Sequence, residues 1–197
     1  MSDKETLGVY ASKAAEYADL TTAANTADPL LTAFIAETVP GGTVLDLGCG
    51  PGTSAALMAR AGLLVHAWDP VPEMVALAQQ HPGVSARVAG FDDLTETAVY
   101  DGIWANYSLL HASRDAMPRH LSAITNALRA GGRFHIALKS GSGCKRDRLG
   151  RLYTYYSDVE LTSLLEDAGL TVTGRAEGVG TGLDGSLSEW ISLAAHA

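Results

Sequence analysis

Residue types that mark several protein classes are scarce in this sequence. Cysteine occurs only twice, as Cys49 and Cys144, and neither stands at a metal-ligand spacing from histidine. This argues against a disulfide framework or a zinc site and suits a reducing compartment. No stretch approaches the roughly 20 apolar residues of a membrane span, and "MSDKETLGVYASK" lacks the apolar core of a leader. We therefore expect a soluble cytoplasmic protein with no membrane partner.

Basic residues are also few. Lysine and arginine total 14 against 22 aspartates and glutamates, which gives a formal net charge of −8. An acidic surface repels phosphate backbones, so nucleic acid is a poor partner. Apolar residues make up 47% of the 197 residues, enough for one substantial core but not for two. We expect a single domain over residues 1–197, and no pattern indicates an oligomeric state.

Strand-like apolar runs alternate with helical patterns along the chain. The helical patterns cover residues 9–38, 53–62, 72–83, 117–132 and 157–169, and the strand patterns cover 41–48, 63–70, 84–91, 100–108, 133–139, 170–180 and 186–197. This alternation predicts an α/β fold: a Rossmann-like, seven-stranded, mostly parallel sheet with helices on both faces. The last two strands are too close for a crossover helix, so we expect an antiparallel hairpin at the end of the sheet.

A glycine-rich turn follows the first expected strand, in "VLDLGCGPGT". In an open parallel sheet, ligands bind beyond the carboxyl ends of the strands, and glycines let the backbone approach them. A dinucleotide fingerprint would need glycine where Thr53 stands, and a phosphate would not be attracted to Asp46. The turn therefore favours a cationic ligand without phosphate.

The stretch "VLDLGCGPG" resembles motif I of the class I S-adenosylmethionine-dependent methyltransferases. The resemblance runs over nearly the whole chain, since "HAWDP", "AGFDDL" and "YDGIWANYSLLHA" match the family at the next three strands. It implies S-adenosyl-L-methionine as cofactor and S-adenosyl-L-homocysteine as product. The contacts that it implies are Asp46, Gly48, Cys49, Gly50 and Gly52 at the amino-acid end, Asp69 and Pro70 at the ribose, Phe91 and Asp92 at adenine, Ala105 and Asn106 beside the cofactor, and Tyr10 as a closing aromatic.

The loop after the fourth expected strand bears on the acceptor. The family's usual mark of amino-nitrogen methylation, Asn-Pro-Pro-Tyr or Asp-Pro-Pro-Tyr, is absent there. His111 in this loop is the candidate general base because its ordinary pKa suits proton transfer. The alternative is a loop histidine packed on the core. We expect no metal, because the family's acid cluster near the fourth and fifth strands is missing.

A basic segment follows the fifth expected strand, in "KSGSGCKRDRLGRLYTYYS". One hypothesis is that residues 140–156 form an active-site loop that binds an anionic acceptor; the alternative is a solvated loop whose cations pair with Asp147 and the acidic body. A helical segment over residues 1–40 is expected to close the site, although its tyrosines could equally pack in the core. The candidate substrate contacts are Tyr17, Arg146, Arg148, Arg151 and Tyr153.

These observations favour an S-adenosylmethionine-dependent methyltransferase that acts on a small molecule by in-line displacement. Two alternatives stay open: a protein that binds S-adenosylmethionine or S-adenosylhomocysteine without transferring the methyl group, and an NAD(P)-dependent oxidoreductase. The residues do not identify the acceptor molecule or its reacting atom, because one fold serves many acceptors.

Overall fold

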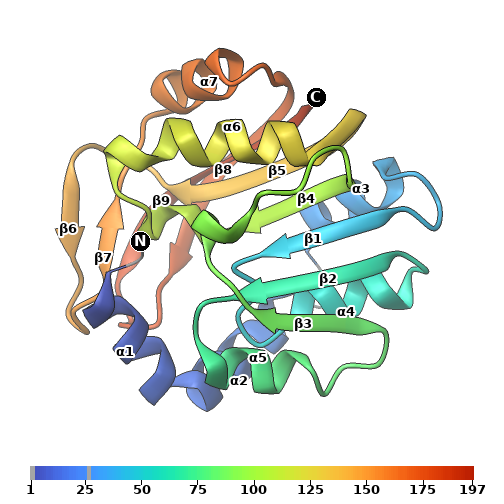
Figure 1. Cartoon of the computed structure of the whole chain (residues 1–197). Coiled ribbons are helices and arrows are strands. Elements are labelled where there is room, and N and C mark those ends of the chain that lie inside the picture. Colours follow the sequence, from blue (N-terminus) through green and yellow to red (C-terminus); the bar gives the residue numbers. More distant parts are fainter. Residues whose placement is uncertain (1–2, 26–27) are drawn as a thin grey trace.

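A twisted seven-stranded sheet forms the centre of the protein, seen in a computed structural model that describes residues 3–25 and 28–197 (Figure 1). Its strand order is β3-β2-β1-β4-β5-β9-β8. The first five strands pair in parallel, and β9 pairs antiparallel with both β5 and β8. The strands are β1 (Thr43–Leu47), β2 (Leu64–Asp69), β3 (Val84–Val88), β4 (Tyr100–Asn106), β5 (Leu128–Lys139), β8 (Thr171–Thr181) and β9 (Leu187–His196).

Helices cover both faces of this sheet (Figure 1). On one face lie α6 (Met117–Ala127) and α7 (Asp158–Asp167), and on the other lie α3 (Pro29–Glu37), α4 (Thr53–Arg60) and α5 (Pro72–Ala78). Adjacent strand residues alternate between these layers, as the pleat requires. Leu45 packs in the core beneath α6, whereas Val44 packs in the core beneath α3 and α4. The expected α/β fold, with its antiparallel hairpin at the end of the sheet, is confirmed.

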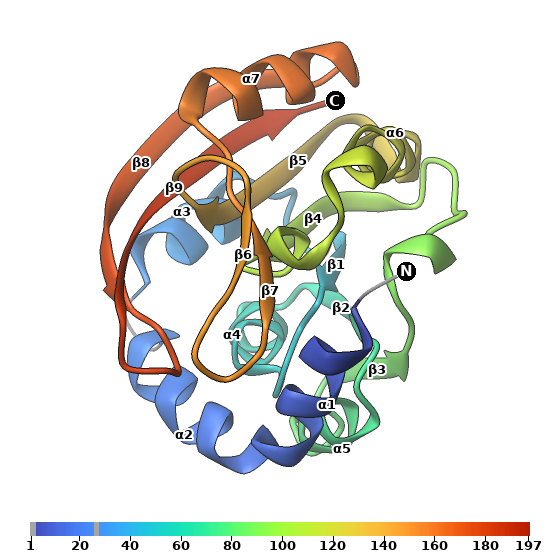
Figure 2. The same cartoon turned by 90° about the vertical axis from the view of Figure 1, so that its left-hand side faces the viewer.

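Two further elements lie at the carboxyl end of the parallel strands. The N-terminal helices α1 (Lys4–Ser12) and α2 (Ala14–Asn25) pass beneath this end, and a small hairpin of β6 (Cys144–Arg146) and β7 (Leu152–Thr154) hangs beside α1 (Figure 2). The Leu152 N–H donates to Thr6 Oγ1 at 2.9 Å, and both guanidinium nitrogens of Arg146 donate to Asp3. These contacts join the hairpin to α1.

Element boundaries differ from the sequence pattern in three places. The expected helix over 117–132 ends at Ala127, because Leu128 already pairs with Tyr100 and Gly131 donates its N–H to Ala197 O. The helical pattern over 9–38 is three helices that begin at Lys4. The basic segment contains β6 and β7 rather than an irregular loop. In the first case pairing with distant segments decides the boundary.

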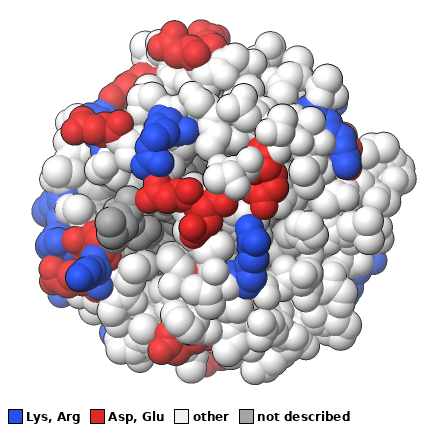
Figure 3. All heavy atoms as spheres, in the orientation of Figure 1, with Lys and Arg blue, Asp and Glu red and all other residues white. Residues whose placement is uncertain are grey.

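The surface carries charges of both signs in small groups with uncharged areas between them, as the face in Figure 3 shows. Acidic residues exceed basic ones over the whole sequence. Among the described helices, none combines the length and the apolar character that crossing a bilayer requires.

Candidate functional site

A cavity of about 640 Å³ lies beyond the carboxyl ends of β2, β1, β4 and β5. Its size falls within the roughly 300–1,000 Å³ of small-molecule sites. The strands, the turns after them, α1, α2, β7 and the β8–β9 hairpin all contribute to its wall. The cavity is lined by these residues that the sequence singled out: Tyr10, Tyr17, Asp46, Gly48, Cys49, Gly50, Asp69, Pro70, Phe91, Asn106, His111, Arg151 and Tyr153.

The glycine turn owes its composition to packing as well as to the cavity. Gly48 and Gly52 have φ of +81° and +82°, a left-handed conformation that residues with a Cβ adopt at a cost. A Cβ on Gly48 would lie 2.3 Å from Ser108 Cβ, and one on Gly52 would lie 2.7 Å from Ala78 Cβ. These two glycines therefore let neighbouring segments close on the turn. Gly50 faces the cavity, where Tyr17 is its nearest neighbour.

Asp46 brings a buried carboxyl to the cavity from the end of β1. Its residue is 3% exposed, and its Oδ2 has no hydrogen-bond partner among the described residues. The carboxyl accepts one hydrogen bond from the Ala55 backbone. Burial raises its pKa to about 7, and the nearby Asp69 adds to that shift. A buried carboxylate oxygen without a donor is costly, so this position suits a cationic donor from a ligand.

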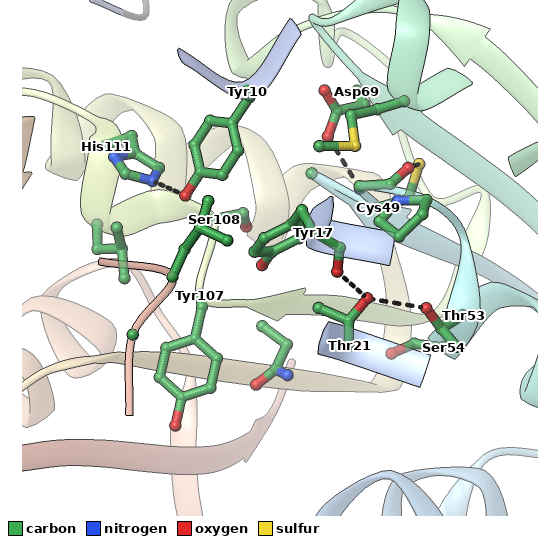
Figure 4. Close-up of a pocket in the computed structure, with 18 of the residues that line it drawn as sticks. Tyr10, Tyr17, Thr21, Cys49, Thr53, Ser54, Asp69, Tyr107, Ser108 and His111 are labelled. Atoms are coloured by element: carbon green, nitrogen blue, oxygen red, sulfur yellow. Dashed lines mark hydrogen bonds between the residues drawn. The ribbon is translucent and has the colours of Figure 1, made fainter. Parts of the chain in front are cut away.

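Asp69 is the last residue of β2, and its carboxylate accepts hydrogen bonds from the two turns that follow β1 and β2. Its Oδ2 accepts the Gly50 N–H at 2.9 Å, and its Oδ1 accepts the Val71 N–H at 2.9 Å (Figure 4). Burial raises the pKa of Asp69 to about 6 despite these two donors. A carboxylate oxygen accepts more than one hydrogen bond, so Asp69 can also bind hydroxyl groups of a ligand in the cavity.

His111 belongs to a directed chain of hydrogen bonds. Its Nδ1 lies 2.7 Å from Leu152 O, which can only accept, so Nδ1 carries the proton of the neutral ring. Its Nε2 then accepts from the Tyr10 hydroxyl at 2.9 Å, as Figure 4 shows. Arg151 Nη1 donates to the same hydroxyl oxygen at 3.1 Å. Burial, together with the charges of Arg151 and Lys139, lowers the pKa of His111 to about 4.

Arg151 connects this chain to the β6–β7 hairpin. It is 2% exposed, and Asp147 Oδ2 accepts from its Nε at 2.9 Å and from its Nη2 at 2.6 Å. The pairing with Asp147 is the one that the second hypothesis for the basic segment expects, and binding of an anionic acceptor by this segment stays a prediction. Arg151 lines the cavity and is also paired with Asp147.

Five residues named from the sequence stand away from the cavity lining. Alternation along β4 turns Ala105 into the core on the face opposite Asn106. Asp92 faces Arg119 at 2.6 Å, whereas the neighbouring Phe91 lines the cavity. Gly52 packs on Ala78 as described above. The remaining two, on the exposed edge of the basic segment, are Arg146, which pairs with Asp3 and Glu5, and Arg148.

Several lining residues were not singled out as site residues from the sequence, and three of them bear on the argument. Lys139 stands at the carboxyl end of β5, a position that the strand-end rule could have marked. Tyr107 follows β4 with φ of +54°, and such strained residues gather at functional sites. Trp190 reaches the cavity only through the register of β9 on β5, for which the sequence holds no local signal.

Comparison with known proteins identifies a domain and several relatives. Residues 44–132 match the model of a methyltransferase domain family. The chain is 31% identical over 119 residues to a ubiquinone biosynthesis O-methyltransferase of Xylella fastidiosa, a match that covers 56% of this chain and 48% of that protein. An enzyme of the same name from Xanthomonas campestris is 39% identical over 74 residues, 34% of this chain and 31% of that protein. The matched region thus spans about half the length of these relatives or less.

Solved structures resemble nearly the whole chain. The 1,6-didemethyltoxoflavin-N1-methyltransferase of Burkholderia thailandensis, crystallised with 1,6-didemethyltoxoflavin and S-adenosylhomocysteine, is 26% identical with a TM-score of 0.79, and the match covers 98% of this chain and 87% of that one. An S-adenosylmethionine-dependent methyltransferase of Mesorhizobium loti is 19% identical with a TM-score of 0.69, over 86% of this chain and 96% of that one. The second likeness concerns the fold alone.

Proposed function

Because this chain carries a methyltransferase domain on the Rossmann-like fold of the S-adenosylmethionine-dependent enzymes, we propose that it methylates a small molecule with that cofactor. The observation that carries the proposal is the buried carboxyl of Asp46, a residue of the cavity lining whose Oδ2 has no hydrogen-bond partner among the described residues. A sulfonium and ammonium cofactor supplies the positive charge that this oxygen lacks. The residues present therefore fit the group.

The end of the cavity that Asp46 and Asp69 line would hold the cofactor. Asp46 and the Gly48–Gly50 turn would bind its amino-acid portion, Asp69 its ribose hydroxyls, and Phe91 its adenine ring. When bound, the cofactor supplies a methyl group on a positively charged sulfur. This methyl is electrophilic without further activation, so the chain mainly aligns the acceptor and excludes water.

Water would be excluded by segments far apart in the sequence. Tyr10 of α1 and Tyr17 of α2 line the cavity from one side, and Arg151 and Tyr153 line it from the hairpin. In this proposal residues 1–40 and 140–156 act as covers of a single catalytic unit, with the cytoplasm as its site of action. Arg146 would hold α1 in place through its hydrogen bonds to Asp3 and would not contact the acceptor.

Similar proteins support a small acceptor but differ in the acceptor atom. The Xylella relative is named as an O-methyltransferase, whereas the Burkholderia structure is of an N-methyltransferase with its heterocyclic compound bound. A relay through Tyr10 would deliver an acceptor's proton to His111 Nε2, because the Tyr10 proton already points there. His111 can take up that proton only against burial and two neighbouring cations, so in this proposal His111 mainly orients Tyr10.

Calorimetry of ligand binding tests the proposal. We expect the protein to bind S-adenosylmethionine and S-adenosylhomocysteine, and we expect Asp46→Asn to weaken S-adenosylmethionine binding by about 10- to 100-fold, the range for a charged hydrogen bond of about 1.5–3 kcal/mol. Asp167→Asn, a change of the same kind on exposed α7, should leave the affinity unchanged. Tight binding of NAD without binding of S-adenosylhomocysteine would overturn the proposal.

A further inference from the structure

Charged side chains are segregated along the cavity. The carboxyls of Asp69 and Asp46 enter from β2 and β1, and the amine of Lys139 enters from the end of β5. Strand β4 lies between β1 and β5 in the sheet. At about 4.8 Å per strand spacing, Asp46 and Lys139 stand on strands roughly 10 Å apart. One cavity therefore has an acid end and a basic end.

Lys139 is a buried cation without a carboxylate of its own. The residue is 9% exposed, and among the described residues no carboxylate oxygen lies within 4.0 Å of its Nζ. Asp184 and Asp147 stabilise its charge without forming an ion pair with it, and Arg151 is a second cation that opposes them. Asp147 forms its ion pair with Arg151. Burying an unpaired ammonium is costly, so a negative group in the cavity would relieve a cost that the fold already carries.

The ring of Tyr153 lies over this amine, and Trp190 stands beside Lys139 on the neighbouring strand. The Lys139 Nζ lies 4.1 Å from the ring centre of Tyr153. Lys139 pairs directly with Trp190 across β5 and β9, and cross-strand partners project from the same face of a sheet. Gly178 makes room for that indole, since a Cβ there would lie 2.7 Å from Trp190 Cζ2. Tyr153 and Trp190 both line the cavity, so flat apolar walls flank the cation.

We propose that Lys139 binds the ionised oxygen or nitrogen of a flat, weakly acidic aromatic acceptor, which lies between the aromatic walls of the basic end. The inference rests on the proposed function and adds the chemical class of the acceptor. The ionised acceptor atom supplies the electron pair of the new bond to the methyl carbon, and the carbon–sulfur bond breaks with its pair passing to sulfur. The acceptor's own proton has already gone to solvent on binding, so no proton moves during transfer.

This arrangement explains why the site can lack a strong base. Methyl transfer neutralises the positive sulfur of the cofactor and the negative atom of the acceptor. A cavity from which water is excluded favours that loss of charge. His111 points its only lone-pair nitrogen at Tyr10, and burial makes it hard to protonate. The basic end instead lowers the pKa of the acceptor itself through the charge on Lys139.

The test uses 4-nitrophenol, whose ionised form absorbs visible light, as a probe of the basic end. Its titration is followed between about pH 5 and pH 9, with and without saturating S-adenosylhomocysteine. We expect the wild-type protein to bind the ionised probe and to lower its pKa. Lys139→Met should remove that shift and weaken binding of the ionised probe at least tenfold.

Three controls separate this role from a structural one. Lys145→Met, on the exposed strand β6, should behave as the wild type. Lys139→Met should keep its affinity for S-adenosylhomocysteine and unfold at the same or a higher temperature, because an unpaired buried cation is removed. Equal binding of the ionised probe by Lys139→Met and wild type, or no binding by either, would overturn the inference. Failure of the wild type to bind S-adenosylhomocysteine would overturn the proposed function instead. The two outcomes are distinguishable because the probe is also titrated without S-adenosylhomocysteine.

Discussion

Asp46 is unfavourable for the ligand-free fold and suited to its proposed ligand. Burial raises the pKa of this carboxyl to about 7, and one of its oxygens has no donor among the described residues. A residue selected only for stability would not be an aspartate here, because an apolar or amide side chain avoids the buried charge. Such a cost at a cavity is typical of a binding residue.

This cost has a definite pH dependence. Because the folded carboxyl holds its proton more tightly than the unfolded one, Asp46 reduces stability as the pH rises from about 4 to about 7. Asp46→Asn removes the effect. Relative to wild type, the variant should gain about 2–3 kcal/mol of unfolding free energy between about pH 5 and pH 8, at about 1.4 kcal/mol per pH unit. Urea unfolding of the ligand-free proteins measures it, and an equal difference at both pH values would contradict the assignment.

Helix α1 packs through apolar side chains on the Val71 and Met74 cluster, and polar contacts at its N-terminus join it to the hairpin. Asp3 caps the helix by accepting the Thr6 N–H, and the same carboxylate accepts two hydrogen bonds from Arg146 of the hairpin. The Arg146 guanidinium holds the pKa of Asp3 below its ordinary value. Helix and hairpin therefore form one cover over the cavity, although more than 130 positions separate them in the chain.

Arg146→Ala should loosen this cover. Without the guanidinium, α1 keeps its own cap at Asp3 but loses the bidentate contact to the hairpin. Hydrogen exchange of the α1 amides should become several-fold faster, and exchange in β1 and β4 should not change, because local opening leaves the core intact. Lys145→Ala, on the adjacent exposed position, is the matched control. Equal exchange in α1 for all three proteins would show that the contact does not hold the helix.

Short-range patterns predicted the parallel half of the fold, and long-range pairing decided the rest. The glycine turn with Asp46, and Asp69 at the end of β2, are encoded by residues next to each other, so they could be located from sequence. The end of α6 at Ala127 depends on the pairing of Leu128 with Tyr100, and the position of Trp190 depends on the β5–β9 register. Neither pairing has a local signature. The acid end of the cavity was therefore predictable, whereas at the basic end the sequence marked Arg151 and Tyr153 but not Lys139 or Trp190.

At the scale of the whole molecule, buried acids and buried histidines have opposing effects on stability. Burial raises the pKa of Asp46 to about 7 and that of Asp69 to about 6, so both lower stability as pH rises above about 4. Burial also lowers the pKa of His111 to about 4 and that of His135 to about 3. These histidines make stability rise with pH up to about 6.5, because they bind protons in the unfolded chain but stay neutral in the folded protein.

We therefore expect the free energy of unfolding to stay level as the pH rises and then to decline. Between about pH 4.5 and pH 6 the two acids and two histidines offset one another, and between about pH 6.5 and pH 7.5 only the Asp46 effect continues. Urea unfolding of the ligand-free protein across this range measures the profile. Steadily rising stability up to about pH 8 would contradict it. Saturating S-adenosylmethionine, whose positive charge would lie at Asp46, should abolish the decline between about pH 6.5 and pH 7.5.

Strand β9 lies inside the sheet although it follows all five parallel strands in the sequence, and this affects how the protein is made. A ribosome releases β1 and β2, with both cavity acids, long before β9 can pair with β5. Until that insertion, the open edge of β5 is a site for mispairing, and Lys139 has no indole beside it. The two acids of the cavity are therefore synthesised well before the strand that places Trp190 beside Lys139.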